Sequence, residues 1–144
     1  MYTYFWRSSP YPFLMTFDAP DANATCTRRI RSNTPLQALT LANDRSFVEM
    51  AGALAARILR DSPSNDDDAR IATAFRICLA REPNAIERQR LAAFVKSQRP
   101  TGKAPANRVV VNEEEDVAEP TPDEIAWTAA ARVLLNLDEF ITRE

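Results

Sequence analysis

Apolar residues recur at helical spacing through most of this 144-residue chain. The clearest case is the stretch from about 67 to 80, where one helical face carries Ile71, Ala74, Phe75, Cys78 and Leu79. The same period occurs in 45–60 and in 85–98, and a shorter apolar run fills 35–42. The pattern therefore predicts an all-α protein.

The stretch from about 122 to 136 is apolar around most of its circumference. Its polar side chains form one stripe at four-residue spacing, made of Glu124, Thr128, Arg132 and Asn136. A helix of this kind belongs inside a bundle. Arg132 is then expected to need a carboxylate partner, because an unpaired buried charge is strongly destabilising. Asp138–Phe140 predict a last short turn.

Polar residues in front of the helices predict where each one begins. Thr34, Asn84 and Thr121 each stand three residues before a Gln or Glu, which is the spacing of a capping box. Proline follows both threonines directly, at the first helical position, where a backbone N–H is not needed. Asn43–Asp44 offer a break or a new cap before the next helix. Ser46 and Glu49 have the spacing of a capping box and predict a fourth one.

The three aspartates Asp66–Asp68 precede the helix at 67–80. Negative charge at a helix start interacts favourably with the helix dipole. A calcium loop is the less favoured interpretation, because the alternating ligands and the glycine of such a loop are missing. We expect these aspartates to cap the helix.

Two segments lack helical periodicity. Residues 1–33 are rich in aromatic side chains and proline, which favours extended backbone. We expect an arm that packs on the helices or on a missing N-terminal part, rather than an aromatic strip for a sugar or peptide. Residues 99–121 combine prolines with an acidic run and predict a mobile loop. Residues 34–144 are then a small irregular bundle of four or five helices.

The first residues have neither the basic start nor the long apolar run of a secretory signal. The aromatic, proline-broken opening instead indicates an arm that continues a domain truncated at Met1. No apolar stretch reaches the roughly 18 to 20 residues of a membrane-spanning helix.

The composition limits which catalytic and binding sites the chain can form. The chain has no histidine, which excludes histidine acid–base catalysis, histidine metal ligands and a C-x-x-C-H haem attachment. Of the two cysteines, Cys78 lies on an apolar helical face, so a buried free thiol is favoured over a disulfide with Cys26. The net charge of −2 gives no indication of nucleic-acid binding. We expect no metal and no cofactor.

Charged and amide side chains concentrate around the helix predicted at 35–42. Three arginines precede its N-terminus, an arrangement that can bind an anion, although pairing with carboxylates is the simpler expectation. We expect this cluster to tie the arm, the 35–42 helix and the 122–136 helix together, and we assign no catalytic residue. The candidate binding residues are Asp18, Asp21, Arg28, Arg29, Arg31, Asn33 and Asp44.

Runs near both ends of the chain resemble a known family. They comprise Phe17–Asp21, Cys26, Arg28–Arg29, Arg31, Asn33–Leu39, Asn43–Asp44, Trp127 and Leu134–Phe140. These residues are similar to the planctomycete-type "domain of unknown function 1553" family, which has no agreed activity. The resemblance implies that the chain is the C-terminal portion of a longer protein, typically exported to the periplasm or the cell exterior. It also implies upstream domains, often a c-type cytochrome domain and a second uncharacterised one.

Three functions follow from these observations. The first and preferred one is a non-catalytic helical module with a structural or interaction role, whose partners are the upstream domains. The second is the C-terminal part of an enzyme acting on polysaccharide, in which the cluster of aspartates and arginines completes a site formed upstream. The third is a partner module for a c-type cytochrome domain, which only the family resemblance implies.

Overall fold

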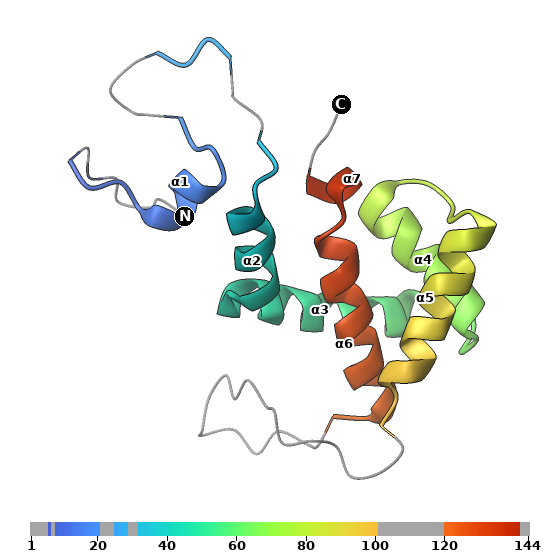
Figure 1. Cartoon of the computed structure of the whole chain (residues 1–144). Coiled ribbons are helices and arrows are strands. Elements are labelled where there is room, and N and C mark those ends of the chain that lie inside the picture. Colours follow the sequence, from blue (N-terminus) through green and yellow to red (C-terminus); the bar gives the residue numbers. More distant parts are fainter. Residues whose placement is uncertain (1–5, 7, 21–24, 29–31, 101–119, 142–144) are drawn as a thin grey trace.

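The computed structural model describes residues 6, 8–20, 25–28, 32–100 and 120–141, and in these ranges the chain forms seven helices and no strand (Figure 1). The helices are α1 (Pro12–Thr16), α2 (Pro35–Asn43), α3 (Arg45–Asp61), α4 (Asp67–Leu79), α5 (Ala85–Gln98), α6 (Pro122–Leu135) and α7 (Asp138–Ile141). The prediction of a small all-α bundle is confirmed. The five longer helices, α2 to α6, begin and end within one residue of the predicted bounds.

Side-chain caps start α2, α5 and α6 as predicted, with both hydrogen bonds of the capping box present in each. The fourth predicted box is wrong. Asp44 caps α3 instead, because its Oδ1 accepts the N–H of Ser46 at 2.9 Å. Helix α3 therefore begins at Arg45, and the Glu49 carboxylate accepts a hydrogen bond from the Arg45 Nε at 2.9 Å rather than closing a box.

Helix α6 forms the centre of the bundle. In Figure 1 it crosses α3, with α2 on one side and the α4–α5 pair on the other. Trp127 is fully buried, with 0% of its surface exposed. Around it, buried alanines lie on both α6 and α3, and small side chains allow two helix backbones to approach closely. The predicted interior position of this helix is confirmed.

Arg132 departs from its prediction. Its side chain is exposed rather than buried, and its Nη2 donates to the backbone carbonyl of Ala42 in the last turn of α2. The carbonyls of a last helical turn have no partner within the helix, and the helix dipole favours positive charge there. The C-terminal end of α2 therefore accepts the hydrogen bond of Arg132, in place of the expected carboxylate.

The N-terminal arm, expected to be extended, contains the short helix α1. Pro12 starts it, and the left-handed backbone of Asp18 (φ 54°) follows its end. There the N–H groups of Asp18 and Ala19 donate to the carbonyls of Met15 and Leu14, which is the hydrogen-bond pattern of a Schellman motif. These local hydrogen bonds stabilise a helical turn in a segment whose prolines favour extended backbone.

Aromatic rings hold α1 against the bundle. Phe13 stacks on Phe47 of α3 with ring centroids 5.7 Å apart, and Phe17 lies 5.8 Å from the same ring. Phe13 and Phe17 also contact one another at 5.3 Å. Such ring pairs add to the stabilisation that burial of apolar surface provides. At Phe13 and Phe17, the arm therefore packs on helix α3.

Both cysteines are free thiols, Cys26 exposed and Cys78 only half-buried. Burial raises the pKa of the Cys78 thiol above its ordinary value. Most of the loop predicted at 99–121 lies outside the described residues, as do the first five residues of the arm.

Ala80 is expected to limit stability at the end of α4. It adopts the left-handed conformation (φ 55°, ψ 25°), which is unfavourable for a side chain with a Cβ. Ala80→Gly should stabilise the domain by about 0.5 to 1 kcal/mol in urea unfolding, because glycine adopts this backbone without strain. The matched control Ala93→Gly, at an exposed position inside α5, should destabilise it by about 1 kcal/mol. Destabilisation by both substitutions would contradict the strain at Ala80.

Candidate functional site

The predicted binding cluster divides among several places in the structure. Asp21, Arg29 and Arg31 lie outside the described residues. Arg28 is exposed, and Asp44 serves as the cap of α3. The remaining two residues, Asp18 and Asn33, take part in contacts that join distant parts of the chain.

Asp18, Ser32 and Gln37 form a part-buried polar cluster, called here the Asp18 latch. The Asp18 Oδ2 accepts hydrogen bonds from the Ser32 hydroxyl at 2.6 Å and from the Ser32 N–H at 2.9 Å. These bonds, the hydroxyl contact first, hold the pKa of Asp18 below its ordinary value. The latch joins the arm to the segment just before α2.

Gln37 is the buried member of the latch, with 2% of its surface exposed. Its Nε2 donates to the Thr16 carbonyl at 2.8 Å, to the Ser32 hydroxyl at 3.0 Å and to Asp18 at 3.3 Å. Its Oε1 accepts the N–H of Thr34 at 3.0 Å, which is the capping-box contact predicted from sequence. One side chain thus starts α2 and binds the end of α1.

Gln37→Leu should destabilise the domain by about 1 to 3 kcal/mol, because it leaves the Thr16 carbonyl and the Thr34 N–H without their partner. Urea unfolding measures the loss. Chymotrypsin cleavage after Phe13 or Phe17 should accelerate, because the arm is held less firmly. The control Gln89→Leu, at an exposed position of α5, should change neither. Unchanged cleavage in Gln37→Leu would show that the aromatic contacts alone hold the arm.

The C-terminal helices also contact α2. The Asn33 side-chain amide donates to the Asp138 carboxylate at the start of α7. The Asn136 amide, just after α6, donates to the Ala38 carbonyl at 3.4 Å. The sequence analysis missed Ser32 as a member of the Asp18 latch, although Ser32 lies only two residues before the cap Thr34. Nothing in the local pattern indicates that Asp18 would reach it.

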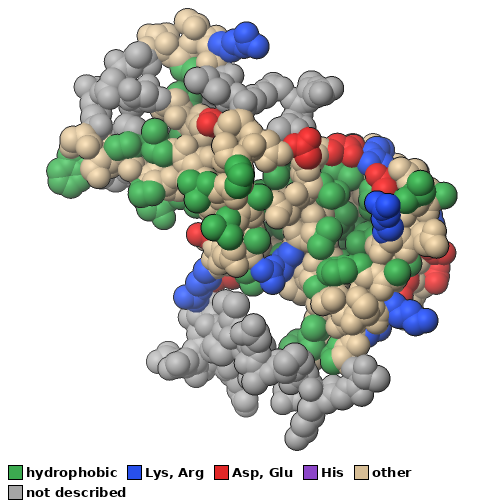
Figure 2. Space-filling view, viewed as in Figure 1, with side chains coloured by type: hydrophobic (Ala, Val, Ile, Leu, Met, Phe, Trp, Pro, Cys, Tyr) green, Lys and Arg blue, Asp and Glu red, His purple; other side chains and the backbone are tan. Residues whose placement is uncertain are grey.

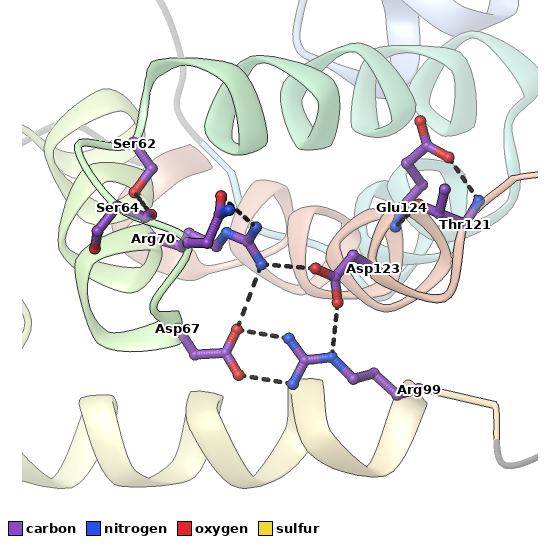
Figure 3. Close-up of polar contacts among 9 residues, drawn as sticks. Ser62, Ser64, Asp67, Arg70, Arg99, Thr121, Asp123 and Glu124 are labelled. Carbon is purple, nitrogen blue, oxygen red and sulfur yellow. Dashed lines mark hydrogen bonds and ion pairs between the residues drawn. The ribbon is translucent and has the colours of Figure 1, made fainter.

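A second polar group lies where the three helices α4, α5 and α6 meet (Figure 3). Arg99, at the end of α5, binds Asp67 with two hydrogen bonds of 2.7 Å and donates through Nε to Asp123 at 2.8 Å. The buried Arg70 completes this ion-pair chain, with its Nη1 2.8 Å from Asp123 and 3.8 Å from Asp67. The charges alternate, so each contact between neighbours is attractive.

The ion-pair chain fixes both ends of the segment between α5 and α6 to α4. Burial raises the pKa of Asp123, but hydrogen bonds from Arg70 and Arg99 outweigh it and hold the pKa below its ordinary value. The expected capping role of the three aspartates is only partly found. Asp66 occupies the cap position without a side-chain hydrogen bond, while Asp67 belongs to the ion-pair chain.

Arg81 joins the α4–α5 turn to α7. Its guanidinium donates to both oxygens of Glu87, at 2.7 and 2.9 Å, and to both oxygens of Glu139, at 2.7 Å each. The same guanidinium lies 5.3 Å from the centroid of the Phe75 ring. Planar guanidinium groups suit such paired carboxylate contacts.

Acid pH is expected to weaken the contact between Arg81 and Glu87. The Arg81 guanidinium first, and then the Asn84 N–H, lower the pKa of Glu87 from 4.5 to about 2. A carboxylate with a lowered folded-state pKa stabilises the fold above its unfolded-state pKa, and this stabilisation is lost as the pH falls from about 4.5 to about 2. Thermal unfolding measured across this range should show a steeper decline in the native chain than in Arg81→Met.

The matched control for this pH dependence is Arg76→Met, which removes a more exposed ion pair with Glu82. Exposed pairs contribute little, so its pH profile should parallel that of the native chain. A profile of Arg81→Met that is equally steep would contradict a special role for the Glu87 pair.

Within the described residues, no group of three or more His, Cys, Asp or Glu side chains is arranged to hold a metal ion. Among the described helices, none combines the length and apolar character that a membrane crossing requires. The charged side chains of the latch and of the ion-pair chain bind other side chains or the backbone of the same chain, so they act first as structural contacts.

A family model described as "PSD1: Protein of unknown function (DUF1553)" matches residues 1–95 of the chain. The match covers α1 to α4 and most of α5. No curated protein and no solved structure matched the chain.

Proposed function

The chain belongs to the DUF1553 family, and on that premise we propose that it is a non-catalytic helical module through which a larger, exported protein packs against a protein partner. Its polar groups support this role. Asp18 binds Ser32 and Gln37, and Asp44 caps α3, so two of the carboxylates that could serve catalysis are engaged in structure. In the proposed arrangement the other domains of the larger protein lie upstream.

The observation that carries the proposal is a set of exposed apolar side chains on α1 and α2, called here the α1–α2 face. It consists of Tyr11, Met15, Leu36 and Leu39, which are between 47% and 60% exposed. Figure 2 shows hydrophobic side chains gathered over α1 and α2 on one side of the molecule. Contiguous exposed apolar surface is typical of a protein–protein contact.

A photo-crosslinking residue placed at Leu39 of the full-length protein tests this proposal. It should give crosslinks to protein well above those from the same group at Ile86. Ile86 is the matched control because it is 61% exposed, against 60% for Leu39, and lies on α5. Equal, background crosslinking at both positions would overturn the proposal. Crosslinks from Leu39 to a haem-containing upstream domain would identify that domain as the partner.

The alternative of a polysaccharide-acting enzyme makes a different prediction. It requires specific glycan binding that depends on the cluster, and a glycan array probed with the full-length protein measures it. Asp18→Asn should then abolish the binding while leaving the fold cooperative. We expect no specific glycan binding.

A further inference from the structure

We propose that the Asp18 latch is a conformational switch that assembles the α1–α2 face. When the latch opens, α1 detaches as one unit and the face is lost, while the bundle of α3 to α6 stays folded. The inference rests on the proposed function, because it names how that same face is controlled. Three observations carry it: the origin of the residues in the face, the place where the contacts of α1 end, and the bonds that close the latch.

The α1–α2 face is built from two separate segments of the chain. Two of its four residues, Tyr11 and Met15, come from α1 and its cap position, and the other two come from α2. Asp18 follows the end of α1 and Ser32 precedes α2, so the hydrogen bonds between them bring the two halves of the face together. A partner that contacts both halves therefore binds the closed form more tightly and shifts the equilibrium towards it.

The described contacts of α1 with the other helices end outside the core. Phe13 and Phe17 contact the Phe47 ring, and the Thr16 carbonyl accepts the Gln37 amide. The thirteen buried residues of the core cluster lie on α3, α4, α5 and α6, and none of these five residues is among them. Helix α1 itself contains no buried residue, and Figure 1 shows it at the edge of the molecule, beside α2. Because local opening that breaks few buried apolar contacts needs less free energy than global unfolding, α1 can detach while the core stays intact.

Hydrogen bonds to a single charged oxygen close the latch. The Asp18 Oδ2 accepts the Ser32 hydroxyl, the Ser32 N–H and the Gln37 amide. Bonds of this kind are stronger when the acceptor is ionised. Asparagine adopts the left-handed backbone of Asp18 (φ 54°) as readily as aspartate does. Asp18→Asn therefore keeps the turn after α1 and the size of the side chain, but it removes the charge and weakens the latch.

Hydrogen exchange of the 144-residue chain, followed by mass spectrometry, tests the detachment of α1. A helix of five residues is unstable by itself, so the amides of α1 exchange once it detaches. Asp18→Asn should speed their exchange roughly tenfold, because the closed form loses hydrogen bonds to a charged group, and should leave α4 and α6 unchanged. The matched control Asp68→Asn, at an exposed position of α4, should leave exchange in α1 unchanged. Unchanged exchange of α1 in Asp18→Asn, or equal acceleration in α1 and α6, would overturn the switch.

Photo-crosslinking in the full-length protein connects the switch to the proposed face. Asp18→Asn combined with Phe47→Ala weakens both attachments of α1, the latch and the ring contacts. Crosslinks to protein from a group at Leu39 should then fall several-fold, because binding is reduced by the fraction of chains that present the complete face. The matched control carries the same two changes at exposed positions elsewhere, Asp68→Asn and Phe140→Ala, and should keep the native crosslinks. Cooperative urea unfolding of both combined variants shows that the bundle has remained folded.

The outcomes also distinguish this inference from the proposed function. Native crosslinks from Leu39 that persist unchanged in the combined Asp18 and Phe47 variant, while its α1 amides exchange freely, overturn the switch and leave the proposed function standing. Absence of crosslinks from Leu39 in the native full-length protein overturns both, because the latch then has no binding face to assemble.

Discussion

Replacement of Trp127 by alanine should remove a large share of the stability of the domain. The side chain is fully buried at the centre of the bundle, and in a close-packed core the surroundings fill such a space only partly. Substitution of a buried aromatic residue by alanine costs about 3 to 5 kcal/mol, a large share of the 5 to 15 kcal/mol typical of a domain. Urea unfolding followed by circular dichroism measures the loss.

Trp127→Phe separates the contribution of side-chain volume to stability from that of a hydrogen bond to the indole. The indole Nε1 is buried and has no hydrogen-bond acceptor among the described residues. Phenylalanine therefore loses volume but no hydrogen bond, and it should cost about 1 to 2 kcal/mol. Ile86→Ala, at an exposed position, should stay within about 0.5 kcal/mol of the native chain. A loss in Trp127→Phe as large as that in Trp127→Ala would point to a bond to the indole nitrogen.

A chain that ends at Pro100 should not fold, although it contains every residue that the family model matches. Of the thirteen buried residues in the core cluster, α6 supplies five, including Trp127. Without them α3 and α5 expose their apolar faces to water, and isolated helices of this length are marginal. Such a chain should show weak helicity by circular dichroism and no cooperative unfolding in urea.

The control for this truncation is a chain that ends at Ile141, which keeps α6 and α7 and should unfold cooperatively. Cooperative unfolding of the shorter chain would show that residues 1–100 form a domain without α6. The folding unit would then coincide with the segment that the family model matches, and the core contacts of Trp127 would contribute little to folding.

The sequence by itself determined the five longer helices, α2 to α6, and where they begin. Capping boxes such as Thr34 with Gln37 act between residues three apart, and the apolar period that marks each helix is equally local. The stretch 122–136 is apolar around most of its circumference, which also indicated a central helix, since such a helix must be covered on most sides. Where two local signals competed, as at Asp44 and Ser46, the pattern alone did not choose between them.

Only the tertiary structure decided which polar groups meet. The Asp18 latch joins residues 14 and 19 apart, Arg70 reaches Asp123 across 53 residues, and Asn33 reaches Asp138 across 105. No periodic pattern encodes such pairs, because they depend on how helices are oriented in space. The same reason explains Arg132. It was expected to be buried because its helix belongs inside the bundle, but the packing of α6 beside α2 leaves it at the surface, bound to a helix end.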